Sequence, residues 1–421
     1  MRIDTVCIHG GYQAKNGEPM VLPIAQSTTF KYDDAQFMGD LFDLKANGHF
    51  YTRLSNPTLE AAEKKIAAME GGVGAMVTSA GQAASMMAVL NLCGAGDHII
   101  CTKGVYGGTF NLLGTSLPKL GVSCDFVDPG ASEETLHALI RPNTKLIFGE
   151  ALSNPSLVVL DIEKFARAAH EAGIPLIVDN TFPTPYNCRP FDFGADIVVH
   201  STSKYLDGHA TALGGVIVDS GNFDWKQNDK FPGLTCPDPS YHGLVYAESF
   251  GRSAYIVKAR AQLMRDYGAQ MSPMNAFLLH SGLDTLALRM ERHNQNGLAL
   301  SRFLAGHAKV SSVHYPFLDG DPYDSLAKRY LNGGSGVIAF EVKNGREGAA
   351  RFMEGLKLAS MAIHVADLRT IVLHPASTTH RQMSDQQLAD AGIGPGLIRF
   401  SVGIEHIDDI IGDVEQALAN A

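Results

Sequence analysis

The sequence predicts an α/β protein with one large, mostly parallel β-sheet and a smaller C-terminal α/β unit. The first observation is that short apolar, β-branched segments alternate with helical patterns between residue 75 and about residue 220. The second is that helical periodicity dominates from Gly251 to about Ala305. The third is that strand-like segments return at Gly336–Val342 and Leu397–Val402. Such alternation builds a helix-covered sheet that binds ligands at the carboxyl ends of its strands.

Three regions are expected in order along the chain. Residues 1–50 mix polar residues, glycine and proline with little periodicity, which predicts an N-terminal arm. Residues 51–250 form the predicted large domain, whose first helix has Thr58 as its cap and ends at Gly71-Gly72. Its strands are expected at 75–78, 98–101, 123–127, 146–149, 176–179, 197–200 and 215–218, and its further helices from residue 81 and at 109–117, 132–140 and 161–172. Residues 251–421 form the C-terminal domain.

One segment of the large domain is predicted as a loop. Residues 222–241 are rich in proline, aspartate and glycine. A long loop of this kind in a compact domain often carries function, so it is expected to be able to close over a site.

The composition narrows the classes of partner. The 421 residues carry a formal net charge of −10, and no run of lysine and arginine exceeds two residues. The sequence therefore predicts no nucleic-acid or membrane partner. No apolar run approaches the roughly 18 residues that cross a bilayer, and the first residues do not make a secretory signal, so a cytoplasmic protein is expected. The six cysteines include no Cys-x-x-Cys and the histidines no His-Glu-x-x-His, so no metal site is predicted.

Lys204 is the most informative residue, because it follows an apolar run and the hydroxyls of Ser201 and Ser203 precede it. An amine at the carboxyl end of a strand, with hydroxyls able to bond phosphate oxygens, is what an enzyme needs to hold pyridoxal phosphate as a Schiff base. Asp179 ends another apolar run, where a buried carboxylate would keep a pyridinium nitrogen protonated. The alternatives are a surface lysine for Lys204, and a helix cap or magnesium ligand for Asp179.

The segment Thr78–Ala84 joins a predicted strand to a predicted helix. Its Gly81 lets the backbone approach an anion closely, and the amides of Gly81 and Gln82 at the start of that helix would hold a phosphate. The alternative is a simple turn between strand and helix. Neither the glycine-rich dinucleotide motif in strand context nor the P-loop motif occurs.

Three further positions are candidates for cofactor or substrate contacts. Tyr106 follows a strand between flexible residues, so its ring could stack on a cofactor ring, with core packing as the alternative. Arg399 lies inside an apolar strand and needs an anion there, either the α-carboxylate of an amino acid or the acid of a structural salt bridge. Tyr51 and Arg53 precede the first helix and could reach a phosphate, or simply form a solvated helix entry.

Together these residues resemble the Cys/Met-metabolism family of fold-type I pyridoxal-phosphate enzymes, over essentially the whole chain. The resemblance rests on the lysine segment, on Tyr51-Thr-Arg-Leu-Ser-Asn-Pro-Thr58 within residues 41–58, and on the segments 106–112, 258–269 and 374–380. It implies that Lys204 is the Schiff-base lysine and that it is catalytic together with Tyr106. It also implies a homotetramer with shared sites, a substrate contacted by Arg399 and His364, and a cofactor held by Asp179, Gly81, Gln82, Ser201, Ser203, Tyr106, Asn154 and, from a neighbouring subunit, Tyr51 and Arg53.

The reaction that the resemblance implies is γ-replacement, in which sulfide or a small thiol displaces acetate from O-acetyl-L-homoserine and gives L-homocysteine or methionine. Cystathionine γ-synthase and methionine γ-lyase chemistry use the same cofactor residues and stay open, as does a pyridoxal-phosphate-binding protein without catalysis. Methionine γ-lyases usually carry a cysteine where this chain has Gly108, which disfavours elimination. His364-Val-Ala-Asp stands where relatives commonly show Ser or Asn followed by Leu/Val-Gly-Asp, so His364 bears on the choice of donor.

Overall fold

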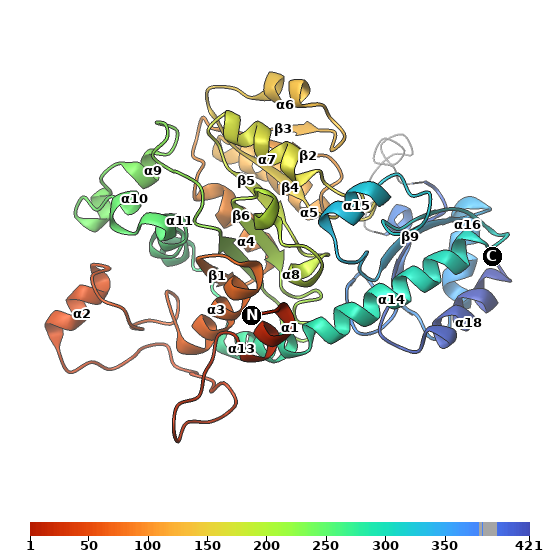
Figure 1. Cartoon of the computed structure of the whole chain (residues 1–421), viewed down its shortest axis with the longest axis horizontal. Helices are drawn as coiled ribbons and strands as arrows, with labels where there is room; N and C mark the ends of the chain where they lie inside the picture. Colours follow the sequence, from red (N-terminus) through yellow and green to blue (C-terminus); the bar gives the residue numbers. More distant parts are fainter. Residues whose placement is uncertain (379–380, 382–393) are drawn as a thin grey trace.

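The computed structural model describes residues 1–378, 381 and 394–421, so residues 379 and 380 of the segment 374–380 lie outside the described residues. The chain forms two β-sheets, each with its own helical cover (Figure 1). The strands of the large sheet are β1 (Gly74–Thr78), β2 (His98–Thr102), β3 (Ser123–Val127), β4 (Thr144–Glu150), β5 (Leu176–Asp179), β6 (Ile197–Ser201) and β7 (Gly215–Asp219).

The large sheet is mostly parallel, as the sequence predicts. Its seven strands have the order β1-β7-β6-β5-β4-β2-β3, and only β7 runs antiparallel to its neighbours. The strands are apolar on both faces because crossover helices cover the sheet, and Ile99, Ile177 and Val198 are fully buried. Helix α4 (Gly81–Leu90) packs on β6 and β7, and α7 (Ile162–Glu171) packs on β4 and β5. The fold class predicted from the alternating pattern is therefore confirmed.

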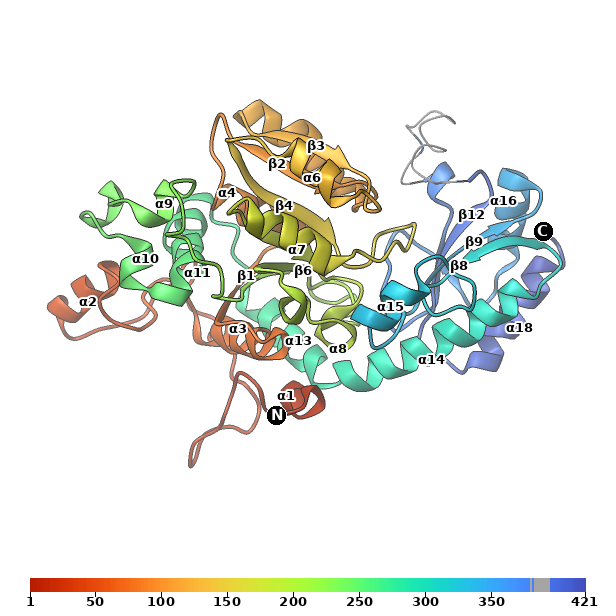
Figure 2. The ribbon, with the colours of Figure 1, turned by 45° about the horizontal axis from the view of Figure 1, so that its top comes forward.

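The second sheet has the order β10-β11-β12-β9-β8 and a separate apolar core. Helix α14 (Leu286–Ala305) packs on α1 and α8 at one end and on β8 and β9 at the other, so it links the two sheets (Figures 1 and 2). The Phe340 ring packs edge-on against Phe352, with 5.6 Å between centroids. The strands are β8 (Val310–His314), β9 (Val337–Val342), β10 (Ser360–Met361), β11 (Ile371–Leu373) and β12 (Leu397–Ser401).

The remaining α-helices fall between these strands and at the chain ends. They are α1 (Ile3–His9), α2 (Ala35–Phe42), α3 (Pro57–Glu70), α5 (Gly107–Asn111), α6 (Glu133–Leu139), α8 (Thr184–Asn187), α9 (Pro232–Thr235), α10 (Tyr246–Ser249), α11 (Ala254–Lys258), α12 (Arg265–Tyr267), α13 (Pro273–Asp284), α15 (Asp324–Tyr330), α16 (Gly345–Gly355) and α18 (Ile407–Leu418). Within the described ranges, no helix is both long enough and apolar enough to span a membrane.

The N-terminal region divides into a docked part and a protruding part. Helix α1 packs on α3 and α13 with Cys7 fully buried, whereas α2 lies at the far edge of the molecule (Figure 1). The start of α3 differs from the sequence prediction. The side chain of Asn56 caps the helix by accepting from the Thr58 amide at 2.9 Å, while the Thr58 hydroxyl donates to the Pro23 carbonyl at 2.8 Å. Thr58 therefore anchors the N-terminal region instead of capping the helix.

Two other predicted segments differ from the structure. The predicted helix 109–117 is α5 up to Asn111, after which the backbone continues as a π-turn and a 3₁₀-turn. The segment 222–241 is irregular apart from α9 and a 3₁₀-turn at Pro239–Tyr241, as predicted for a loop, but it is held in place. Trp225 and Phe231 are buried, and the Trp225 ring stacks on Tyr255 with 5.5 Å between centroids. Anchoring aromatic rings of this kind would have to leave the core for the segment to close over a site.

Candidate active site

Three neighbouring strands of the large sheet end at the same place. Glu150 ends β4, Asp179 ends β5 and Ser201 ends β6, and Glu150 is in register with Asp179. Lys204 lies in the turn that follows β6. Burial, and after it the positive charge of Arg399, lower the pKa of Lys204 to about 8. A lysine with such a pKa supplies far more neutral, nucleophilic amine near neutral pH than a surface lysine does.

Asp179 is oriented by the residue two positions further along the chain. Its Oδ1 accepts from the Thr181 amide at 2.9 Å and from the Thr181 hydroxyl at 2.5 Å. Burial raises the pKa of this carboxyl, and the Thr181 hydrogen bonds oppose that rise. A cationic N–H group placed against Asp179 would therefore be bound strongly, because it would stabilise a carboxylate that burial otherwise disfavours.

Glu150 was not predicted from the sequence, yet it touches two site residues. Its Oε1 accepts from the backbone amide of Tyr106 at 2.5 Å and so fixes the start of α5. Burial raises the pKa of Glu150 well above its usual value, and the adjacent Asp179 raises it further. The Tyr106 side chain is 53% exposed, so its ring is free to cover a ligand and is not a core residue.

The predicted phosphate site lies at the N-terminus of α4. No side chain caps this helix, so its first amides are available to an anion. A Cβ added to Gly81 would lie 2.6 Å from Ser201 Cβ, so only glycine allows this close packing. Ser201 Oγ lies 2.9 Å from Ser203 Oγ, which places both hydroxyls together beside the helix start. The side chain of Gln82 donates to the Gly108 carbonyl at 2.9 Å, so its backbone amide is the group that faces a phosphate.

Arg399 reaches the site from β12 of the second sheet. Its side chain donates to the carbonyl oxygens of Ile363 and His364 at 3.0 and 3.3 Å and to Asn154 Oδ1 at 3.3 Å. No carboxylate among the described residues forms an ion pair with it, so the predicted salt-bridge alternative is not seen. The guanidinium is 6% exposed, and burial lowers its pKa to about 10. A buried cation with only neutral partners is a strong site for an anion.

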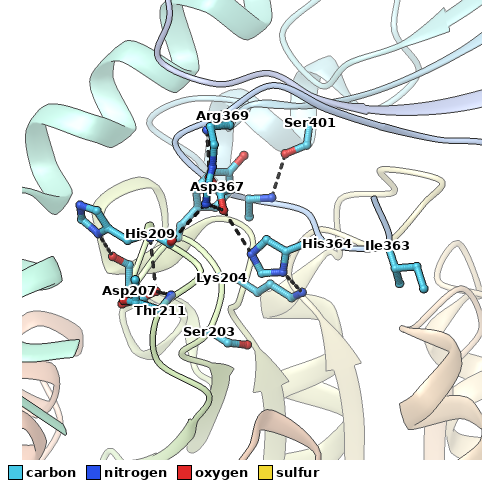
Figure 3. Close-up of polar contacts among 12 residues, drawn as sticks. Ser203, Lys204, Asp207, His209, Thr211, Ile363, His364, Asp367, Arg369 and Ser401 are labelled. Atoms are coloured by element: carbon cyan, nitrogen blue, oxygen red, sulfur yellow. Dashed lines mark hydrogen bonds and ion pairs between the residues drawn. The ribbon is translucent and has the colours of Figure 1, made fainter. Parts of the chain in front are cut away.

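His364 lies on the loop between β10 and β11 and contacts Lys204. Its Nδ1 is 3.2 Å from Lys204 Nζ, and its Nε2 is 3.7 Å from Asp367 Oδ2 (Figure 3). The imidazole thus lies between the amine and the carboxylate. The structure thus places His364 beside Lys204, and its predicted contact with the substrate stays a prediction.

Comparisons with known proteins agree with this geometry. The family model for Cys/Met metabolism PLP-dependent enzymes matches residues 4–419. The chain belongs to this family. The predicted family and its pyridoxal phosphate cofactor are thereby confirmed.

The relatives match from end to end. The chain is 43% identical to an O-acetyl-L-homoserine sulfhydrylase of Leptospira meyeri, with 99% of this chain and 96% of the relative covered. It is 46% identical to a homocysteine synthase of Schizosaccharomyces pombe, with 99% and 97% covered. A crystal structure of a Campylobacter jejuni protein assigned as an O-acetylhomoserine (thiol)-lyase is 37% identical, covers 100% of both chains and has a TM-score of 0.96.

The residues of this family member fit pyridoxal phosphate. The uncapped start of α4, with the paired hydroxyls of Ser201 and Ser203, suits a phosphate dianion. The partly buried carboxyl of Asp179 suits a cationic ring nitrogen, and Lys204 would supply the amine that bonds the aldehyde.

Tyr51 and Arg53 are not brought together with Lys204. They line a separate cavity of about 820 Å³ beneath the N-terminal region, shared with Tyr241 and Arg265. Arg53 Nη1 donates to the Arg265 carbonyl at 2.6 Å, and Tyr51 is 40% exposed. Neither residue contacts the cofactor site of its own chain in the described structure, and their contribution to a neighbouring subunit stays a prediction.

Two functional residues were missed by the sequence analysis. Glu150 ends a strand beside Asp179, and a search for acids at successive strand ends would have found it. Asp367 lies inside the segment already singled out for His364, three residues further on, but no local pattern says that the two side chains meet.

Proposed function

We propose that this chain converts O-acetyl-L-homoserine and sulfide, or a small thiol, to L-homocysteine, or methionine, and acetate. The observation that carries the proposal is the convergence on one site of the Lys204 amine and the buried Arg399 guanidinium, which forms no ion pair with any described residue. The full-length relatives named as O-acetyl-L-homoserine sulfhydrylase and homocysteine synthase support it.

The residues of the chain divide the work. Arg399 binds and orients the α-carboxylate of the amino-acid substrate through its two parallel N–H groups. Lys204, freed from the cofactor, accepts the α-proton on Nζ and returns a proton later, which its pKa of about 8 allows in both directions near neutral pH. Pyridoxal phosphate, when bound, supplies the electron sink that makes the α-proton of the substrate acidic enough to be removed. Asp179 holds its charge against the ring nitrogen, and Tyr106 covers the ring.

The attachment point of the cofactor has support from the solved relative. That structure carries a pyridoxyl-lysine phosphate at position 205 of its chain, and the two chains align over their full lengths. Lys204 is the lysine of this chain next to that number, in the segment that the sequence singled out. Lys204 is therefore the proposed Schiff-base residue.

Gly108 favours replacement over elimination in this proposal. A Cβ added to Gly108 would lie 2.5 Å from Tyr106 Cε1 and 3.1 Å from Gln82 Oε1. With the Tyr106 ring in this position, the chain has no room for the cysteine that methionine γ-lyases usually carry there. The acceptor site is then lined by backbone and the tyrosine ring, without a thiol.

The proposed assembly is a homotetramer with shared sites. Tyr51 and Arg53 lie at a cavity on another part of the chain, away from Lys204. A second copy would allow these two side chains to reach the phosphate of the neighbouring site. The six cysteines are unpaired, which suits the cytoplasmic location that is part of the same proposal.

The test is product analysis with the purified protein and O-acetylhomoserine. With sulfide, homocysteine and acetate should form in equal amounts, and replacing Lys204 by Ala should abolish both. Formation of cystathionine with cysteine at a higher rate than homocysteine with sulfide would assign the protein to cystathionine synthesis. Release of ammonia from methionine as the main reaction would assign it to elimination. Absence of acetate release under every condition would reject catalysis on this donor.

A further inference from the structure

His364 occupies a fixed place between the two units of the chain. Its imidazole is about one quarter exposed, and it lies between Lys204 from the large sheet and Asp367 from its own loop (Figure 3). Four charged groups face it, namely Lys204, Asp367, Arg369 and Arg399. Burial, and after it the positive charge of Lys204, lower the pKa of His364 to about 4. The imidazole is therefore neutral at neutral pH.

The neighbours of a neutral imidazole determine which nitrogen carries its hydrogen. Nε2 faces the Asp367 carboxylate at 3.7 Å, and a carboxylate only accepts. The carboxylate is too far away for a hydrogen bond, but its negative charge favours the hydrogen on Nε2, which leaves the lone pair on Nδ1. That lone pair faces Lys204 Nζ at 3.2 Å, where it accepts an N–H of the amine.

The loop around His364 is held at several points, so the imidazole is positioned in advance. Ser401 Oγ accepts from the Ala366 amide at 2.8 Å, and Arg399 binds the carbonyl of His364. Arg369 pairs with Asp367 through Nε and Nη2, both at 2.8 Å. The Leu368 amide donates to the Gly208 carbonyl at 2.9 Å, four residues after Lys204. The loop is thus fixed both to β12 and to the segment that carries the lysine.

We propose that His364 is a positioning residue for Lys204, and that its Nδ1 holds one N–H of the free amine so that the nitrogen lone pair points at the aldehyde of the cofactor. In that reaction the amine nitrogen forms a C=N bond with the aldehyde carbon, and the aldehyde oxygen leaves as water with both amine hydrogens. This role rests on the proposed function only in taking Lys204 as the Schiff-base lysine. It differs from a substrate-binding role, because the ring nitrogen that reaches the site, Nδ1, is engaged with the Lys204 amine.

Replacements of matched shape test the proposal in the full-length protein. His364→Asn keeps an acceptor oxygen at the δ1 position. The leucine of His364→Leu has nearly the same shape as asparagine but carries no acceptor. The exposed His209 lies on the loop after Lys204, and its ring faces the Asp207 carbonyl, so His209→Asn is the control. The readout is the rate at which the protein, freed of cofactor, gains the absorbance of the lysine adduct when pyridoxal phosphate is added. Turnover of O-acetylhomoserine with sulfide is measured in parallel.

The expected pattern is specific. His364→Asn and His209→Asn should react with pyridoxal phosphate within about threefold of the unmodified protein, and His364→Leu about tenfold more slowly, as the loss of one hydrogen bond at a reacting amine implies. His364→Leu should also lower kcat while leaving KM for O-acetylhomoserine nearly unchanged.

The opposite outcomes are equally clear. Equal rates for the Leu and Asn variants, whether fast or slow, would overturn the proposal, because the acceptor atom would then be irrelevant. If His364→Leu fails to fold by thermal melting, His364→Ala takes its place with the same expectation. If the unmodified protein forms the adduct but never turns over O-acetylhomoserine with sulfide, the proposed function fails, whereas the adduct rates still decide the role of His364.

Discussion

Replacing Arg399 by Met should remove the proposed carboxylate site. Among the described residues, the buried guanidinium contacts neutral oxygens at 3.0–3.3 Å and forms no ion pair, so a substrate carboxylate would compete for the N–H groups of both outer nitrogens. Hydrogen bonds to charged groups contribute about 1.5–3 kcal/mol each, so two of them amount to about 3–6 kcal/mol. With about 1.4 kcal/mol for each factor of ten, kcat/KM should fall by roughly 10²–10⁴-fold.

The same replacement should change the reactivity of Lys204. The positive charge of Arg399 is, after burial, the main cause of the lowered pKa of Lys204. Removing a positive neighbour favours the ammonium form, so the pKa of Lys204 rises from about 8 towards its usual 10.5. In the protein freed of cofactor, the rate of reaction with pyridoxal phosphate follows the neutral amine. The pH midpoint of this reaction rate should therefore move to higher pH in Arg399→Met.

Arg399→Lys is the matched control, because lysine keeps the charge and loses the two-pronged geometry. It should lower kcat/KM nearly as much as Arg399→Met but leave the pH midpoint of cofactor attachment unchanged. The assays are steady-state kinetics with O-acetylhomoserine and sulfide, and stopped-flow absorbance from about pH 6 to 10. The reasoning is refuted if Arg399→Met keeps kcat/KM within tenfold, or if its midpoint moves to lower pH.

Replacements at three residues test other parts of the structure. Lys204→Ala should abolish turnover and the visible absorbance of the lysine adduct, and retained activity would rule out Lys204 as the attachment site. Glu150→Gln keeps the oxygen that accepts from the Tyr106 amide and should leave cofactor affinity nearly unchanged, whereas Glu150→Leu loses about 1 kcal/mol, or roughly fivefold, in a pyridoxal phosphate titration; equal affinities would contradict this. The fully buried His293 has its pKa lowered from 6.5 to about 4, so the folded state is favoured above pH 6.5 and loses about 3 kcal/mol as the pH falls to 4. Thermal melting of His293→Gln should show a weaker acid dependence, and an unchanged one would assign the acid sensitivity to other groups.

The large sheet was predictable because its signal is local. Strands that are buried on both faces must be apolar throughout, and the predicted strand at 176–179 is β5 as the structure has it. The helix cap was misassigned because Asn56 and Thr58 both carry capping side chains, and only the contact of Thr58 with Pro23 decides between them. The segment 222–241 has the composition of a loop, and its anchoring depends on contacts of Trp225 with residues distant in sequence.

The proposed cofactor lysine and acid were likewise predictable, since Asp179 ends a recognisable strand and Lys204 lies in the turn directly after another. Lys204 and Asp179 follow directly from that pattern. Glu150 has the same pattern but no partner nearby in sequence, and its contact with the Tyr106 amide spans 44 residues. The pairing of His364 with Lys204 spans 160 residues and requires the second sheet to lie against the first. Contacts of this kind are set by tertiary packing, which no periodic pattern encodes.

Substrate binding and lysine positioning share one loop, and this makes them interdependent. The Arg399 Nη2 that is available to a substrate carboxylate is the same group that donates to the carbonyls of Ile363 and His364. An incoming carboxylate competes for these N–H groups, so it weakens the hydrogen bonds from Arg399 to the loop that carries His364. The hydrogen bond of the Ala366 amide to Ser401 and the pairing of Asp367 with Arg369 are not affected. The His364 imidazole is then less tightly held against Lys204 when substrate is present. Substitutions at Arg399 and His364 should therefore be non-additive, because each changes the environment of the other.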